Sequence, residues 1–232
     1  MSASAIAILV AGGAGSRVGA GTPKQFLPLG GKPLLAHALA HFDGCPAVRR
    51  IVLVLPREGF IESCRIMEPY LDQKPVNFVP GGETRQASTW EGLSTVDATY
   101  DGIVAVHDGA RPCADGALIE RVVAAAVEHQ AAIAAVPVVE TLKALADEHT
   151  IRETVERGAF CRAQTPQCFD HGLLRRAFER AQKDGFEGTD EATLVERLDV
   201  SVHLVLGSER NIKVTTPDDF ARVEYFLERG GA

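Results

Sequence analysis

The sequence alternates short apolar runs with helical patterns over most of its first 136 residues. Five of the runs have the length and composition of buried strands. They are Ala5 to Val10, Ile51 to Leu55, Val76 to Val79, Ile103 to Val106 and Ala132 to Val136. Helical patterns at about 33–42, 84–96 and 115–128 separate most of them. Because parallel strands need crossover connections, this alternation predicts an α/β fold, a Rossmann-like and mostly parallel sheet flanked by helices.

The alternation changes after Pro137. The segments VVETLKAL and TIRETVE contain β-branched and charged residues but no long helical face, so we expect an antiparallel excursion here. We assign it to an extended β-arm at about 138–158. At roughly 150 residues per domain, the length then leaves one domain over residues 1–232 with this arm appended.

Beyond the arm the alternation resumes. The expected elements are helices at about 172–182 and 189–197, a strand at 202–206 and a last helix that begins with Thr216-Pro217-Asp218-Asp219. That string offers a threonine cap, a proline at the first helical position and two carboxylates at the positive end of the helix dipole.

Composition argues against several classes of protein. The chain has 24 Lys and Arg against 31 Asp and Glu, a net charge of −7, which argues against a surface that coats nucleic acid. The five cysteines are an odd number and form no C-x-x-C pair, so neither a disulfide framework nor a zinc ribbon is expected. The longest apolar region, from Val122, is interrupted by charged residues and Pro137. We expect a cytoplasmic protein with no nucleic-acid or membrane partner.

A glycine-rich stretch, LVAGGAGSRVGAGTPKQF, follows the first predicted strand. Ligands of open α/β sheets bind at the carboxyl ends of the strands. Gly12, Gly13 and Gly15 let backbone N–H groups approach a phosphate chain, and Arg17 and Lys24 add cations. Neither the dinucleotide fingerprint nor the P-loop spacing is met. A tight turn with two solvated cations is the alternative, but the length and placement of the loop favour a phosphate-bearing ligand.

Asp108 lies just beyond another predicted strand, at the same edge of the sheet. A hard carboxylate there suits Mg²⁺, which keeps several waters and takes triphosphate oxygens plus one or two protein oxygens. An aspartate that only caps a turn is the alternative. We expect the neighbouring His107 to be packed or hydrogen-bonded rather than a general base.

Seven further segments occur in order along the chain. They are PKQF (23–26), GGETR (81–85) with Ser88, VHDGARP (106–112), ETLK (140–143), QTPQ (164–167), TDEATLVE (189–196) and NIKVT (211–215). Together with AGGAGSR they resemble the nucleotidyltransferases that activate sugar or polyol phosphates. Among these, the chain is similar to the 2-C-methyl-D-erythritol 4-phosphate cytidylyltransferase family of the non-mevalonate isoprenoid pathway. It departs from the family at Gly109, where alanine is usual, and at Glu209 and Arg210, where some members carry aspartate.

This resemblance implies transfer of CMP from CTP to 2-C-methyl-D-erythritol 4-phosphate, with Arg17 and Lys24 as the catalytic cations. The nucleotide-binding residues that it implies are Ala11, Gly12, Gly13, Gly15, Arg17, Lys24, Gly82, Arg85, Ser88 and Asp108. The residues that it implies for the second substrate are Arg111, Thr141, Arg157, Thr165, Thr189 and Lys213. Magnesium is the expected cofactor, held at Asp108. Thr84 and Thr189 also fit helix N-caps, which is the structural alternative for both segments.

The resemblance also implies a homodimer with shared active sites, in which the arm embraces the partner and Arg157 reaches the partner's substrate. Two other functions compete with this hypothesis. One is a cytidylyltransferase for a different polyol phosphate, such as ribitol 5-phosphate. The other is a nucleotide-binding regulator without catalysis.

Overall fold

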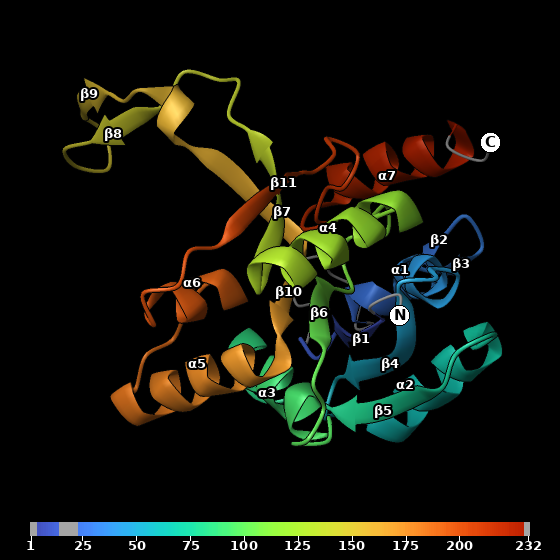
Figure 1. Cartoon of the computed structure of the whole chain (residues 1–232). Coiled ribbons are helices and arrows are strands. Elements are labelled where there is room, and N and C mark those ends of the chain that lie inside the picture. Colours follow the sequence, from blue (N-terminus) through green and yellow to red (C-terminus); the bar gives the residue numbers. More distant parts are fainter. Residues whose placement is uncertain (1–3, 14–22, 230–232) are drawn as a thin grey trace.

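The computed structural model describes residues 4–13 and 23–229, in which a seven-stranded sheet has the strand order β11-β7-β10-β6-β1-β4-β5 (Figure 1). Its strands are β1 (Ala5–Val10), β4 (Val48–Leu55), β5 (Val76–Pro80), β6 (Ile103–Asp108), β7 (Ala131–Pro137), β10 (Cys161–Asp170) and β11 (His203–Leu206). Every neighbouring pair is parallel except the two made by β10. The predicted α/β fold with a mostly parallel sheet is therefore confirmed.

Helices cover both faces of the sheet, and this explains why its central strands are apolar on both sides. One face carries α1 (Leu34–Asp43), α2 (Phe60–Met67) and α4 (Gly116–His129). The other face carries α3 (Arg85–Ser94), α5 (His171–Asp184) and α6 (Glu191–Glu196). The last helix, α7 (Pro217–Arg229), belongs to a smaller apolar cluster with Leu34 of α1. Among the α-helices of the described residues, only α2 falls in a stretch for which the sequence predicts no element.

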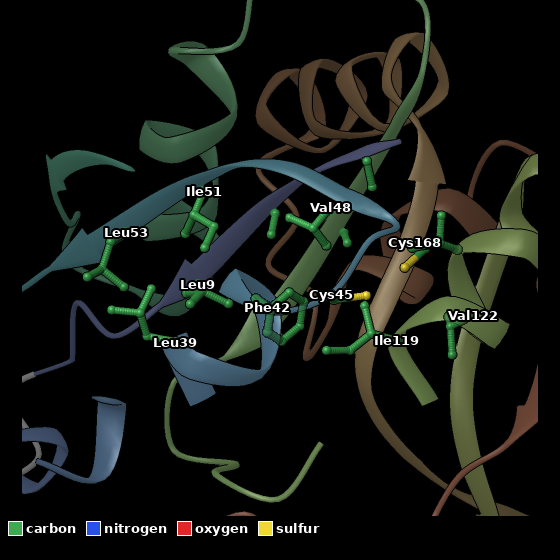
Figure 2. Packing of buried hydrophobic residues seen from close by; sticks show 14 of the residues in the cluster. Leu9, Leu39, Phe42, Cys45, Val48, Ile51, Leu53, Ile119, Val122 and Cys168 are labelled. Carbon is green, nitrogen blue, oxygen red and sulfur yellow. The ribbon is translucent and has the colours of Figure 1, made fainter. Parts of the chain in front are cut away.

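Successive residues of β1 pack into different cores, because side chains of a strand point alternately to opposite faces. Leu9 packs in one cluster with Leu39 and Phe42 of α1, whereas Ile8 belongs to the cluster on the opposite face. Figure 2 shows the first cluster, in which Ile119 of α4 lies close to Phe42. Full burial of each large apolar side chain contributes about 1.5–3 kcal/mol. Packing on both faces thus fixes the strand ends that carry the candidate site.

The main difference from the sequence-based prediction is β10, a ten-residue strand in a stretch where the sequence predicts none. Its sequence, CRAQTPQCFD, has no continuous apolar run. Pro166 has no N–H to donate to a neighbouring strand, and the pairing of β10 with β7 shifts register between Ala163 and Gln167. The strand nevertheless lies between β6 and β7, antiparallel to both.

The arm connects β7 to β10 and contains a two-stranded antiparallel sheet of β8 (Lys143–Leu145) and β9 (Ile151–Thr154). The expected antiparallel excursion is therefore confirmed. In Figure 1 the arm extends away from the central sheet. It exposes four large apolar side chains, those of Val139, Leu145, Ile151 and Phe160. An isolated hairpin is marginal in water, so an arm of this kind needs another surface to pack on.

The shorter elements complete the chain. They are the strands β2 (Pro28–Leu29) and β3 (Lys32–Pro33) and the 3₁₀ helices η2 (Lys24–Phe26), η3 (Glu68–Tyr70) and η4 (Arg157–Ala159). Gly30 and Gly31 join β2 to β3 with φ of 53° and 80°, in the left-handed region that favours glycine. Across residues 4–13 and 23–229, no helix has the length and apolar character needed to cross a membrane.

Candidate active site

A cavity of about 400 Å³ lies at the carboxyl ends of β1 and β6, where ligands of open α/β sheets bind. The residues that line it are Val10, Ala11, Gly12, Gly13, Lys24, Gln25, Gly82, Glu83, Thr84, Arg85, Ser88, Asp108, Ala110, Lys213 and Thr215. All the predicted nucleotide-binding residues that the structure describes are among them. The two others, Gly15 and Arg17, lie outside the described residues.

The glycine loop is held by a buried glutamine that motif reasoning does not single out. Gln25 is 3% exposed, and its Nε2 donates hydrogen bonds to the carbonyl oxygens of Ala11, at 2.8 Å, and Gly13, at 3.0 Å. Lys24, the preceding residue, donates from Nζ to the Val214 carbonyl at 2.8 Å. Gln25 and Lys24 both belong to the short 3₁₀ helix η2, which thus positions the loop backbone and the lysine.

A second loop packs directly on the first. A Cβ atom at Gly12 would lie 2.7 Å from Ser88 Oγ and 3.2 Å from the Cα atom of Gly81, so only glycine fits. Ser88 is buried, and its Oγ accepts a hydrogen bond from the Gly82 N–H at 3.1 Å. Thr84 caps α3, since its Oγ1 accepts from the Ala87 N–H at 3.1 Å. The predicted cap is therefore confirmed, and Gly82, Arg85 and Ser88 of the same segment line the larger cavity.

Asp108 ends β6 and is surrounded by three cations. Its Oδ1 accepts a hydrogen bond from Arg85 Nε at 2.9 Å. Its Oδ2 lies 2.9 Å from Lys213 Nζ and 3.6 Å from Arg111 Nε. Burial by itself raises the pKa of this carboxyl, but Arg85, Lys213 and Arg111 together hold the pKa well below its ordinary value. The group is therefore an ionised acceptor at neutral pH.

A smaller cavity of about 160 Å³ adjoins the first. It is lined by Arg85, Asp108, Arg111, Ala163, Gln164, Thr165, Gln167, Thr189, Asp190 and Lys213. Three residues, Arg85, Asp108 and Lys213, line both cavities. Four of the six residues predicted for the second substrate lie here, namely Arg111, Thr165, Thr189 and Lys213.

The other two predicted residues, Thr141 and Arg157, lie on the arm and line neither of these cavities. Both are exposed. Arg157 donates from its guanidinium to the Val139 carbonyl at 2.6 Å, across the base of the arm. Within the single chain, the structure does not bring these two residues to the other four.

Thr189 is not a helix cap, so the structural alternative given for this residue is wrong. Asp190 caps α6 instead, and its carboxylate accepts a hydrogen bond from the Thr193 N–H at 3.0 Å. Both residue types are good N-caps, so the local sequence does not choose between them. The exposed Thr189 is left to line the smaller cavity.

His107 is buried behind the site and hydrogen-bonded at both ring nitrogens, as expected. Its Nε2 lies 3.0 Å from the Arg111 carbonyl and must carry the proton, because a carbonyl only accepts. Its Nδ1 then accepts from the Thr165 hydroxyl at 2.9 Å. Burial lowers the pKa of His107 to about 4. The ring is neutral at physiological pH and orients Thr165.

These observations define a class of protein. A glycine-lined cavity and a smaller polar cavity meet at a cationic cluster on the carboxyl edge of an α/β sheet. Backbone N–H groups, a lysine and an arginine suit the phosphates of a nucleotide, and the adjoining cavity suits a second anionic ligand. This is the arrangement expected of a nucleotidyltransferase.

Comparisons with known proteins agree with this class. The sequence model of the 2-C-methyl-D-erythritol 4-phosphate cytidylyltransferase family matches residues 5–229. The protein of that name from Syntrophotalea carbinolica is 42% identical over 226 residues, which are 97% of this chain and 96% of that protein. The one from Geotalea uraniireducens is 43% identical over 225 residues, 96% of each chain. The chain therefore belongs to the 2-C-methyl-D-erythritol 4-phosphate cytidylyltransferase family.

Solved structures show the same similarity in three dimensions. The crystal structure of 2-C-methyl-D-erythritol 4-phosphate cytidylyltransferase from Thermus thermophilus matches with a TM-score of 0.77 at 34% identity, covering 98% of this chain and 100% of that one. The crystal structure of 4-diphosphocytidyl-2C-methyl-D-erythritol synthase from Anaerococcus prevotii matches with a TM-score of 0.83 at 28% identity, covering 97% and 99%.

The buried neutral His107 makes a prediction for stability against pH. The unfolded chain binds a proton at this residue below about pH 6.5, whereas the folded protein does so only near pH 4. The free energy of unfolding should therefore fall as pH decreases from 6.5 to 4. His107→Gln should reduce the slope of this fall by up to about 1.4 kcal/mol per pH unit. Urea titrations of the ligand-free protein at pH 6.5, 5.5 and 4.5 measure it.

His149→Gln, at an exposed position of the arm, is the control and should keep the wild-type slope. Part of the slope remains in His107→Gln, because burial also lowers the pKa of His41. A wild-type slope in His107→Gln would contradict the assignment of a buried, neutral ring.

Proposed function

We propose that the chain transfers CMP from CTP to 2-C-methyl-D-erythritol 4-phosphate, giving 4-diphosphocytidyl-2-C-methyl-D-erythritol and pyrophosphate. One observation carries the proposal: the two adjoining cavities share Arg85, Asp108 and Lys213. A nucleotide in the larger cavity and a phosphorylated polyol in the smaller one would meet at these three side chains. The names of the relatives supply the identity of the two substrates.

The proposed reaction forms one bond and breaks one. A phosphate oxygen of the polyol phosphate attacks the α-phosphorus of CTP, and the bond from this phosphorus to the bridging oxygen of the β-phosphate breaks as pyrophosphate leaves. The attacking phosphate is already ionised, so no general base is needed. Catalysis then rests on positioning and on stabilising the negative charge that develops. Lys24 lines the larger cavity and fits this role; Arg17 is proposed for it from the sequence.

The smaller cavity has the chemistry of a phosphorylated polyol site. Arg111 and Lys213 supply positive charge, and Thr165 and Thr189 supply hydroxyl groups. The net charge of −7 supports the expectation that the protein does not coat nucleic acid. We also propose a cytoplasmic location, on the basis of five cysteines that are all free thiols in the structure.

Asp108 fits a magnesium ion that takes most of its ligands from the triphosphate. The described residues contain no cluster of three or more metal-ligating side chains, so a cage made of protein alone is not supported. The carboxylate is ionised, and its Oδ1 makes one hydrogen bond, to Arg85, which leaves a lone pair for an ion. A bound Mg²⁺ would neutralise phosphate charge and polarise the α-phosphate.

We further propose a homodimer in which the arm completes the partner's active site. Thr141 and Arg157 line neither cavity of their own subunit, although the resemblance assigns both to the second substrate. The arm extends from the body in Figure 1 and exposes apolar side chains, which a symmetric partner would cover.

Lys24→Ala tests the central assignment. We expect pyrophosphate release from CTP and 2-C-methyl-D-erythritol 4-phosphate to fall by about 10²- to 10³-fold in kcat, because a cation aimed at developing charge acts mainly in the transition state. The KM for CTP should change much less. Lys32→Ala, an exposed lysine on β3, is the control. Near-normal turnover in folded Lys24→Ala would remove Lys24 from the catalytic groups.

A panel of CTP, UTP and ATP against methylerythritol and ribitol phosphates tests the substrates in the same assay. Turnover with ribitol 5-phosphate in preference to methylerythritol phosphate would favour the other polyol. CTP binding without pyrophosphate release would favour a regulator.

Chelation tests the proposed cofactor. EDTA should abolish turnover and Mg²⁺ should restore it, since triphosphate charge would otherwise be uncompensated. Asp108→Asn should raise the Mg²⁺ concentration that gives half-maximal turnover. Circular dichroism with and without EDTA checks that the fold does not change. Full turnover in EDTA would exclude a metal requirement.

A mixture of two inactive variants tests the shared site. If Arg157 serves the partner's site, a heterodimer of Arg157→Ala and Lys24→Ala contains one doubly altered site and one intact site. Subunit exchange should then restore up to half of the wild-type activity per mixed dimer. Exchange verified by native mass spectrometry without any recovery of activity, or sedimentation of a monomer only, would contradict the proposal.

A further inference from the structure

Glu191 is a buried carboxylate one layer behind the active site. It is the first residue of α6, is 1% exposed and lines neither cavity. A charged group is seldom buried to this degree unless it is paired and hydrogen-bonded. The groups that pair with Glu191 therefore indicate the role of its buried carboxylate.

Glu191 makes a bidentate ion pair with Arg85. Its Oε1 accepts from Arg85 Nη1 at 2.8 Å and its Oε2 accepts from Arg85 Nη2 at 2.9 Å. The Thr89 hydroxyl lies 3.0 Å from the same Oε1. Two parallel hydrogen bonds to a planar guanidinium fix its orientation as well as its position.

The remaining side of this guanidinium faces the active site. Arg85 Nε donates to Asp108 Oδ1 at 2.9 Å, so one rigid planar group touches Glu191 on one edge and Asp108 on another. Both carboxylates raise the pKa of Arg85 more than burial lowers it. Glu191, which lines neither cavity, is thereby connected to Asp108 through Arg85.

Glu191 is itself fixed to the central sheet. Gln167 of β10 donates from Nε2 to the Asp190 carboxylate at 2.8 Å, and its Oε1 accepts from the Ala192 N–H at 3.1 Å. The start of α6 is thus tied on both sides of Glu191 to the strand next to β6.

We propose that Glu191 is a positioning residue for the transfer reaction, acting through Arg85 on Asp108 at the junction of the two cavities. Without its carboxylate, the guanidinium is free to turn away from Asp108 or toward the phosphates of the nucleotide. Only the activity readout of this proposal rests on the proposed function. It predicts a change in turnover that exceeds any change in substrate binding.

The test compares five variants with the wild type for kcat, for both KM values and for thermal stability. Glu191→Gln should lower kcat by about 10- to 100-fold, as expected for reacting groups that are slightly misplaced, with each KM changed less than threefold. Arg85→Gln should also lower kcat. In the double variant, Glu191→Gln should add nothing to the effect of Arg85→Gln, because its influence passes through that side chain.

Two controls separate positioning from stability. Thr89→Val removes a buried hydroxyl that contacts Glu191 but not Asp108, and it should lower Tm while leaving kcat within threefold. Glu196→Gln, at the exposed end of α6, should change neither. If Glu191→Gln does not fold, Glu191→Asp takes its place with the same expectation, since it keeps the charge but shortens the reach.

A kcat within twofold of the wild type in folded Glu191→Gln would overturn the proposal, as would effects of Glu191→Gln and Arg85→Gln that multiply. A crystal structure of the folded position-191 variant gives an independent readout. Arg85 Nε should leave Asp108 Oδ1, and an unchanged contact would overturn the proposal. That measurement needs no turnover, so it decides the role of Glu191 even if the wild type releases no pyrophosphate from CTP, the result that would overturn the proposed function.

Discussion

The arrangement of the active site depends on how one carboxylate, that of Asp108, is kept charged at the end of a buried strand. Withdrawing such a group from water costs several kcal/mol unless opposite charges and hydrogen bonds replace the lost hydration. Here the compensating groups come from α3, from the loop after β6 and from the segment before α7, as Arg85, Arg111 and Lys213. One electrostatic requirement thus brings two distant parts of the chain, α3 and the segment before α7, to the strand end that the loop after β6 already adjoins.

The same cluster would let a protein with a net charge of −7 bind two anions side by side, as the proposed reaction requires. In this ion-paired group, three cations face the two carboxylates of Asp108 and Glu191, so the group carries one net positive charge. The side chains are already oriented by one another before any ligand arrives. A phosphate that enters meets hydrogen-bond donors that do not have to reorient. Electrostatic stabilisation is most effective under this condition.

How far the sequence predicts this structure depends on how local each signal is. The bounds of β1 follow from its sequence, because AIAILV is buried on both faces and contains no polar residue. The positions of Gly12 and Asp108 at the edge of the sheet are predictable in the same way, because Gly12 follows β1 and Asp108 ends β6. The sequence does not predict β10, because Pro166 and its polar neighbours leave no apolar run there. Its place in the sheet is set by pairing with strands far along the chain. Glu191 acts on a residue 106 positions away, and no local pattern carries that contact.

The course of β10 has a consequence for any assembly that the arm forms. This strand starts at the base of the arm, where Cys161 pairs with Pro137, and it passes Thr165 and Gln167 at the smaller cavity before it ends. Contacts made by the arm and contacts made by a ligand thus bear on one continuous piece of backbone. If docking of the arm on another subunit tightens ligand binding at this cavity by some factor, thermodynamic linkage requires the ligand to tighten subunit association by the same factor. Cooperativity between subunits would then require no structural element other than this strand.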